Sequence, residues 1–346
     1  MTDEVVANQR RASIGDVASR AGVSKTTVSH VVNGTRLVSE PTKQRVLGAI
    51  VELGYHPSAA ARSLTTKKSG VVGVMISDAR NPFFGELLRG IEDAFGTAGY
   101  GLMVCNTDEL LKRERLYLDL LLRQQVDGII AAAASRDWAV LNRARTYHLP
   151  IVFVDRRFED MPGPFVGVDN EGGAYTGTAH LIEAGHRRIG LVAGFSRLST
   201  MRERTAGFRR ALQEGGITAS KEWIVSCPLK VESGRSSVHR ILSTSPRPTA
   251  LFINNNLLAL GALLALKDLG LRCPEDVALI GFDDHPWATV SAPPMTVVDQ
   301  PVREVGRTAA RMLSDLMRDR EGDGSEVVLP CNLVLRDSCC PDHPGR

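Results

Sequence analysis

Cysteine is scarce in this 346-residue sequence, and the cysteines that occur are scattered. They stand at positions 105, 227, 273, 331, 339 and 340, with no CxxC spacing among them. This pattern does not fit a disulfide scaffold and argues against a zinc module. Cys339 and Cys340 fall in a polar tail and are predicted to be free thiols. We expect neither a metal nor a cofactor.

Catalytic motifs are also missing. The sequence has no GxSxG, no GxxxxGKS/T and no HExxH, and its glycine-rich stretches lack the GxGxxG spacing of a dinucleotide site. Each of these motifs places a nucleophile, a phosphate or a metal ion. His180 and His186 flank an expected helix end and are interpreted as surface or capping residues. We therefore predict no catalytic residues.

Export and membrane signals are not found either. The N-terminal MTDEVVANQRR carries acids where a signal peptide carries basic residues, and no apolar core follows. No window approaches 18 uninterrupted apolar residues, as a spanning helix requires. We expect a cytoplasmic protein without a membrane partner.

The composition that is present predicts a soluble protein of two or three domains. Apolar residues make up 43% and charged residues 23% of a chain too long for one ordinary core. Residues 1–69 hold ten Lys/Arg and five Asp/Glu, a net charge of +5, and the remainder holds 32 and 34, a net charge of −2. A small basic head on a slightly acidic body fits a polyanion-binding module joined to a second function.

The basic head is predicted to hold three short helices. Ser13 is a suitable N-cap with Asp16 at the capping-box position, and Ser24 caps a second helix after a glycine turn. A third helix begins after Ser39 and ends at Gly54. A helix, a tight turn and a second helix with a polar outer face is the arrangement that reads a DNA major groove. A small helical bundle without a ligand is the alternative.

The body alternates short apolar runs with amphipathic stretches. Strand runs are expected at 71–76, 101–105, 128–132, 151–154, 189–193, 250–253 and 277–280, and helices at 84–98, 109–124, 172–184, 203–214 and 257–269. This rhythm predicts a doubly wound α/β fold with parallel sheets covered by helices. The segments SDARNPFF, NTDE and VDRRFEDM then lie at carboxyl ends of strands, where open α/β sheets bind ligands.

The head, from Ser13 to Leu64, closely resembles the LacI-type repressor family and is nearest to its purine-repressor branch. The resemblance places Lys25, Thr26 and His30 at base-reading positions. It also implies that Pro57–Thr65 is a hinge helix that orders on operator DNA, with Leu64 as a wedge in the minor groove; a core leucine is the alternative. The DNA-binding residues it implies are Ser13, Ser24, Lys25, Thr26, Thr27, Ser29, His30, Asn33, Ala61 and Leu64.

The body resembles the same family through FVGVDNEGGAYTGTAHLIEAGHRRIGLVAG, RERTAGFRRAL, PTALF and ALGALLALKDLGLRCPEDVALIGFDD. The resemblance implies a periplasmic-binding-protein-like (type I) pair of α/β lobes, crossed by three strands, which forms a homodimer and holds a small effector between the lobes. The implied division is a head at 1–56, a hinge and linker at 57–69, a sensor domain at 70–337 and a tail at 338–346. The N-lobe comprises 70–168 and 299–323, and the C-lobe comprises 169–298 and 324–337.

The resemblance also implies a set of effector contacts. These are Ser77, Phe83, Phe84, Asp108, Asp155, Thr200, Arg204, Asn255, Asp283 and Trp287. The alternatives are an interlobe ion pair for Arg204 and Asp283, and a core position for the aromatic residues. The sequence departs from the family in two ways: Asn256 replaces a carboxylate, and Leu198 and Leu229 match the arginine and phenylalanine that hold the purine. We therefore predict a sugar, polyol or sugar acid rather than a purine.

The functional prediction is a transcriptional repressor that binds a palindromic operator as a homodimer and is switched by the effector. A solute-binding module of a transport system would use the same two lobes, and an enzyme on a doubly wound fold would require a nucleophile, a metal or a cofactor loop. The attached basic head argues against the first alternative, and the missing catalytic motifs argue against the second.

Overall fold

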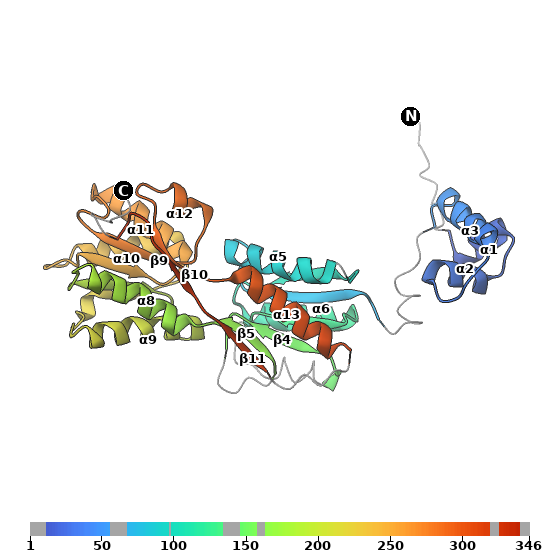
Figure 1. Cartoon of the computed structure of the whole chain (residues 1–346), viewed down its shortest axis with the longest axis horizontal. Helices are drawn as coiled ribbons and strands as arrows, with labels where there is room; N and C mark the ends of the chain where they lie inside the picture. Colours follow the sequence, from blue (N-terminus) through green and yellow to red (C-terminus); the bar gives the residue numbers. More distant parts are fainter. Residues whose placement is uncertain are drawn as a thin grey trace, which may run out of the picture. The chain divides into compact units, whose positions relative to one another are not determined.

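The computed structural model describes residues 12–55, 68–96, 98–133, 146–157, 163–318 and 325–339. The chain divides into two compact units, Met1–Ser69 and Gly70–Arg346, which are coloured blue and cyan to red in Figure 1. Among the described residues, no helix combines the length and the apolarity that crossing a membrane requires.

The first unit contains the three predicted helices, α1 (Ile14–Ala21), α2 (Lys25–Asn33) and α3 (Glu40–Glu52). Both predicted N-caps are confirmed: the Ser13 side chain accepts from the backbone of Asp16 in a complete capping box, and Ser24 accepts from Thr27. The turn between α1 and α2 passes through Gly22 at φ 65°, a left-handed conformation that glycine adopts without strain. The small core of the three helices is formed by Val17, Ala18, Ala21, Val28, Val46 and Ala49. The predicted hinge contacts Ala61 and Leu64 lie outside the described residues.

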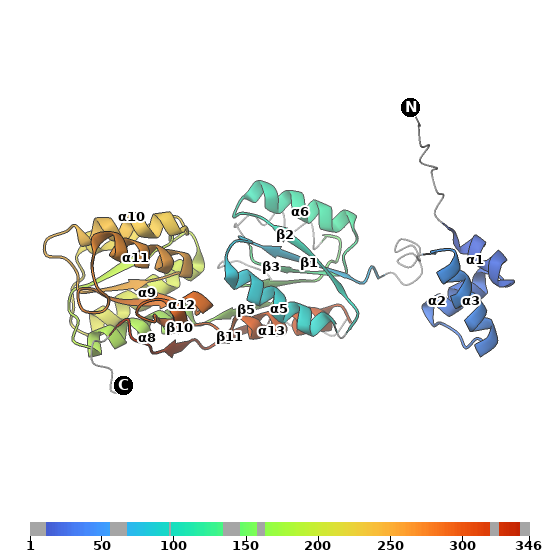
Figure 2. The same ribbon diagram turned by 90° about the horizontal axis from the view of Figure 1, so that it is seen from above.

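The first lobe of the second unit is a six-stranded sheet in the order β11-β5-β4-β3-β1-β2, parallel in every pairing. Its strands are β1 (Val71–Ile76), β2 (Gly101–Asn106), β3 (Gly128–Ala131), β4 (Ile151–Val154), β5 (Phe165–Val168) and β11 (Glu326–Leu329). The helices α5 (Pro82–Gly96) and α13 (Val302–Leu316) cover one face, and α6 (Leu111–Arg123) covers the other, as Figure 2 shows. Both faces are therefore buried, which explains the continuous apolar runs of the strands.

The second lobe repeats this plan with the order β12-β10-β9-β8-β6-β7, in which only β12 is antiparallel. Its strands are β6 (Ile189–Ala193), β7 (Ile224–Ser226), β8 (Ala250–Ile253), β9 (Ala278–Phe282), β10 (Thr296–Asp299) and β12 (Asn332–Val334). Its helices are α8 (Asn170–Glu183), α9 (Ser199–Glu214), α10 (Val231–Leu242), α11 (Asn256–Leu269) and the short α12 (Pro286–Val290), with a 3-10 turn at Lys221–Trp223. The pair α8 and α9 packs on one face and α10 and α11 pack on the other, so the predicted α/β architecture is confirmed.

The assignment of the last segments to the lobes differs from the prediction. The segment from 324 was expected in the C-lobe, but β11 pairs with β5 and completes the first sheet. The chain therefore makes its third crossing after Leu329, and only β12 belongs to the second sheet. The predicted tail also begins too early, because Ser338 and Cys339 are fully buried and the Ser338 carbonyl accepts from the backbone of Leu279.

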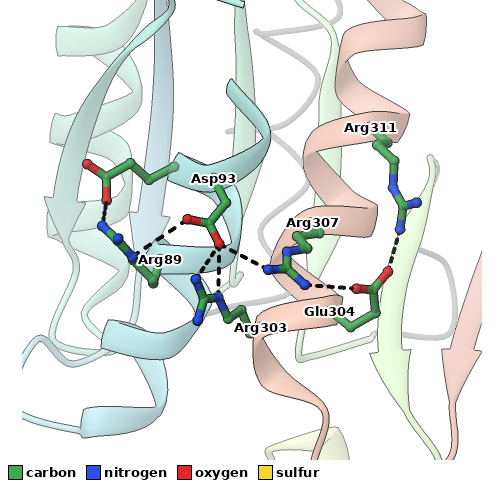
Figure 3. A network of polar contacts seen from close by, with 7 residues as sticks. Arg89, Asp93, Arg303, Glu304, Arg307 and Arg311 are labelled. Carbon is green, nitrogen blue, oxygen red and sulfur yellow. Dashed lines mark hydrogen bonds and ion pairs between the residues drawn. The ribbon is translucent and has the colours of Figure 1, made fainter. Parts of the chain in front are cut away.

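Helices α5 and α13 approach each other unusually closely. A Cβ added to Gly90 would lie 2.1 Å from the backbone oxygen of Arg303, and one added to Gly306 would lie 2.3 Å from that of Leu87. Charged side chains join the same two helices (Figure 3): Asp93 accepts from Arg303 at 2.6 Å and from Arg307 at 3.2 Å. This contact fixes α5, whose first turn contributes Phe84 to the cleft between the lobes.

Candidate functional site

Helix α2 presents an exposed polar first turn. Lys25 and Thr26 are both exposed, whereas Val28 on the opposite side is fully buried in the head. The Ser24 cap and Thr27 are engaged with each other, since the Thr27 backbone donates to the Ser24 side chain at 3.1 Å. A polyanion approaching the start of α2 therefore meets Lys25 and Thr26 first, and side chains on the first turns of a recognition helix are the ones that reach base edges.

The other predicted DNA contacts on α2 are held in place by neighbours. The His30 ring pairs through Nδ1 with the Thr35 hydroxyl at 2.8 Å, and the Asn33 amide donates to the Ser29 hydroxyl at 3.2 Å. Both contacts are local, and Ser29, His30 and Asn33 are half-buried whereas Thr35 is exposed. They orient His30 and Asn33 before any ligand arrives, which reduces the entropy lost on binding.

In the second unit, one cavity opens between the two lobes. From the first lobe it is lined by Ser77, Asp78, Arg80, Asn81, Phe84, Asp108, Glu109, Leu110 and Arg156, and from the second by Phe195, Arg197, Leu198, Cys227, Pro228, Leu229, Lys230 and Leu257. The three segments predicted from the sequence, SDARNPFF, NTDE and VDRRFEDM, each contribute to it. Their strands β1, β2 and β4 end at the same edge of the sheet, where a doubly wound fold places its ligand.

Among the ten predicted effector residues, the cavity brings together Ser77, Phe84 and Asp108. Phe83 stands edge-to-face on Phe84, with ring centroids 5.1 Å apart, but lines a second cavity that it shares with Asp283. Asp155 lines a third. The remaining four, Thr200, Arg204, Asn255 and Trp287, line none of these three cavities.

The side chain of Arg204 is engaged within the second lobe. Its Nε donates to the Asn170 side chain at 2.8 Å, its Nη1 donates to the Asn254 carbonyl at 2.7 Å, and its guanidinium lies 3.6 Å from the centre of the Phe282 ring. Asp283 accepts instead from Gln300, and the described residues show no ion pair between Arg204 and Asp283. In this structure Arg204 therefore braces the start of α8 and the end of β8.

Asn255 and Trp287 also have structural partners. The Asn255 side chain caps α11 by accepting from the backbone of Leu257 at 2.9 Å. Trp287 is half-buried and packs against the core of the second lobe beneath α10 and α11. The core position that was left open for the aromatic residues is observed for Phe83 and Phe84, which are buried in the first lobe, whereas Trp287 lies at the margin of the second-lobe core.

The cavity contains more charged groups than the sequence indicated. Arg80, Arg156, Arg197 and Lys230 line it, as do Asp78 and Glu109. Burial raises the pKa of neighbouring Asp155, against the opposing effect of Arg156 and then Arg204. Arg80 and Arg156 fall inside the predicted segments, but the pattern could not show which side chain of a segment enters the cavity.

Two residues that argued against a purine do line the cleft. Leu198 is buried to 4% exposure at the start of α9, and Leu229 packs from the loop after β7. They give the second-lobe wall an apolar patch, flanked by Arg197 and Lys230. The cleft thus has an apolar wall in one lobe and a mainly charged wall in the other.

Comparison with known proteins agrees with both units. Residues 13–58 match the family of bacterial regulatory proteins of the lacI type, and residues 178–339 match a periplasmic binding protein-like domain. The chain is 38% identical over 328 residues to the HTH-type transcriptional repressor PurR of Photobacterium profundum and 40% identical over 329 residues to that of Aliivibrio salmonicida, in each case across 94% of this chain and 98% of the relative. The lac repressor dimer bound to operator and the anti-inducer ONPF aligns with a TM-score of 0.86 at 28% identity, across 96% of this chain and 100% of that chain.

The helix-turn-helix head and the two-lobe domain together define a DNA-binding transcriptional regulator rather than an enzyme. The chain belongs to the LacI family, as the head and body sequences indicated, and is a PurR-like repressor of that family. Repressors of this family bind operator DNA and small-molecule effectors.

Proposed function

We propose that this repressor binds a palindromic operator as a homodimer, and that an effector in the cavity between the lobes switches its affinity for that operator. The observation that carries the proposal is the cavity itself: residues from both lobes line it, so a bound ligand contacts both lobes at once. A ligand of that kind changes the relative stability of the open and closed lobes.

The switch acts on DNA through the dimer. Closure or opening of the lobes changes the separation of the two segments at Pro57–Thr65, which lead from the sensor domains into the heads. When these segments are close, two heads contact adjacent major grooves and two Leu64 side chains enter the minor groove between them. When they are apart, only non-specific phosphate contacts remain.

The effector class differs from the one predicted from the sequence. The relatives named PurR favour a purine over a sugar, polyol or sugar acid, and we propose a purine-class effector. The family resemblance matches Leu198 and Leu229 to the purine-repressor arginine and phenylalanine. On this proposal the polar groups of the ligand bind to other residues of the cleft.

Selection of duplexes from a random pool with the purified chain tests the DNA-binding proposal. We expect enrichment of a palindrome with a flexible pyrimidine–purine step at its centre, because kinking such a step costs least. Enrichment of non-palindromic sites would contradict the proposal that the chain binds DNA as a homodimer. If no sequence were enriched, with or without a metabolite extract, the proposal that the chain binds an operator would be contradicted.

A further inference from the structure

Two buried polar groups in the cleft have no hydrogen-bond partner among the described residues. They are the Ser77 hydroxyl and, on Arg156, the Nη1 and Nε atoms. Ser77 is fully buried and Arg156 is 4% exposed. Buried polar groups are nearly always satisfied, and a buried guanidinium with unsatisfied donors is especially unfavourable. Because both residues line the same cavity, a ligand there is placed to supply the missing acceptors.

Arg156 has ion pairs with two carboxylates but does not use all of its hydrogen-bond donors. Its Nη2 donates to Glu109 at 2.6 Å, and its Nε lies 3.4 Å from a carboxylate oxygen of Asp155 without hydrogen-bond geometry. Both Nη1 and Nε of Arg156 therefore have donor capacity that the described residues do not use. Ser77 follows β1 and Arg156 follows β4. The strand β3 lies between them in the sheet and is followed by Ala132 and Ala133, which have small side chains.

The acidic residues of the cleft are already paired with arginines. Asp78 accepts from Nε and Nη2 of Arg80 at 2.9 and 3.0 Å, and Asp108 accepts from Arg113. Glu109 is shared between Arg156 and, at 3.9 Å, Arg197.

Lys230 supplies a further positive charge to the cavity. It lies on the second-lobe wall and has no ion pair within 4 Å among the residues the structure describes. The binding capacity left over in the cleft is therefore cationic and hydrogen-bond donating.

We infer that Ser77 and Arg156 form an oxyanion subsite, so that the effector carries a carboxylate or phosphate group. The inference rests on the proposed function of the cleft as the effector site and adds a charge requirement to it. Arginine binds both groups through parallel N–H donors, and the Ser77 hydroxyl supplies a further donor from the first lobe. A purine that meets this requirement bears an acidic substituent, as a mononucleotide does, and a free neutral base does not.

Calorimetric titration with matched neutral and acidic ligands tests the inference. The pairs are inosine and inosine 5′-monophosphate, ribose and ribose 5-phosphate, and glucose and gluconate, with inorganic phosphate as the anion alone. We expect the acidic member of at least one pair to bind roughly tenfold or more tightly than its neutral mate, as a charge-assisted contact in a buried site provides. The pair whose acidic member binds more tightly shows whether the subsite prefers a phosphate or a carboxylate.

Two variants and a matched control locate the effect. Arg156→Gln removes the charge, and Ser77→Ala removes only the hydroxyl. Both should reduce the preference for the acidic ligand. In Arg156→Gln the ratio of the neutral to the acidic dissociation constant should fall to near one. Arg157→Gln alters the adjacent arginine, which pairs with Glu326 outside the cleft, and should keep the preference intact. Thermal unfolding of each variant shows whether it is folded. If Arg156→Gln does not fold, Ser77→Ala still tests the inference.

Three results would overturn the inference. They are tighter or equal binding of every neutral member, an acid preference that survives in both variants, and no binding of any acid in the panel. None of them bears on the operator selection, so a failed oxyanion subsite and a failed repressor proposal are distinguishable.

Discussion

The side-chain amide of Asn256 donates a hydrogen bond to the side-chain oxygen of Asn81, with 2.8 Å between nitrogen and oxygen. Asn256 begins α11 in the second lobe, and Asn81 precedes α5 in the first lobe and lines the cleft. Asn256 also contacts Nε2 of buried His285 at 2.5 Å. Asn256 therefore joins the two lobes beside the cavity.

A double-mutant cycle with Asn81→Ala and Asn256→Ala should show coupling between the two residues. We expect a coupling energy of about 1 kcal/mol in the free energy of unfolding, because a buried neutral hydrogen bond contributes about that much. The cycle is needed because Asn81 also accepts from the backbone of Phe83 and Asn256 from that of Leu257. Additive effects would show that the interlobe bond contributes nothing.

Gly90→Ala should destabilise the first lobe, because its new Cβ would overlap the Arg303 backbone on α13. Overpacking of this kind costs about 1–3 kcal/mol, which lowers the melting temperature by several degrees. Gly85→Ala on the same helix is the control: its Cβ meets nothing within 4 Å, so its melting temperature should be unchanged or slightly higher. Equal effects of the two substitutions would contradict the close packing of α5 and α13.

The pKa of Asp268 should be low and should depend on α10. Hydrogen bonds from Arg235 first, and then from His239, lower the pKa of this carboxyl from 3.8 to about 2. The stabilisation from a depressed carboxyl pKa is complete above the ordinary value and is lost as the pH falls towards 2.

A carboxyl titration by nuclear magnetic resonance checks the Asp268 prediction. It should show a low midpoint that rises towards 3.8 in Arg235→Gln and rises less in His239→Gln. The reverse order would contradict the dominant role of Arg235.

Lys25→Ala or His30→Ala should relax base preference at one position of each half-site. The expected loss is about 1–3 kcal/mol against the preferred base pair, because base-edge contacts carry sequence discrimination. Lys43→Ala provides a control, since Lys43 is an exposed lysine of α3 near Glu40. Anisotropy titrations with single-base operator variants measure the effect, and an equal loss on every sequence would reassign these residues to phosphate contacts.

Leu64→Ala should weaken operator binding while the dimer and the affinity for the effector stay as they were. The leucine is expected to act only in the minor groove, where an apolar wedge exchanges base stacking for a bend. Operator affinity by anisotropy, dimerisation by sedimentation and effector affinity by calorimetry separate the three properties. Operator affinity equal to that of the unmodified chain would rule out the wedge.

Local features were predictable from the sequence, and non-local ones were not. The Ser13 and Ser24 caps depend on residues three positions away, and β1, β4 and β8 are buried on both faces, so short apolar runs reveal them. Helix α10 was missed because VESGRSSVHRIL has few apolar residues, and it is held by its contact with α11. The lobe of β11 depends on its pairing with β5 across more than 150 residues, which no local pattern encodes.

The cleft was predictable at the level of segments. Because β1, β2 and β4 are parallel, the segments that follow them had to lie at the same edge of the sheet, and in the structure they do. Which side chains enter the cavity depends on loop conformation: Arg156 faces the cleft while adjacent Arg157 pairs with Glu326. Family positions such as Arg204 were carried over by resemblance, and their internal hydrogen bonds became visible only in the structure.

The most direct test of the account is the affinity of the full chain for its selected palindrome, measured by anisotropy with and without the small-molecule fraction of a bacterial extract. A ligand-switched repressor predicts a change in the operator dissociation constant of roughly 5–150-fold, which corresponds to the usual coupling energy between two allosteric sites. A dissociation constant that is the same under both conditions would contradict the claim that the cleft controls the head.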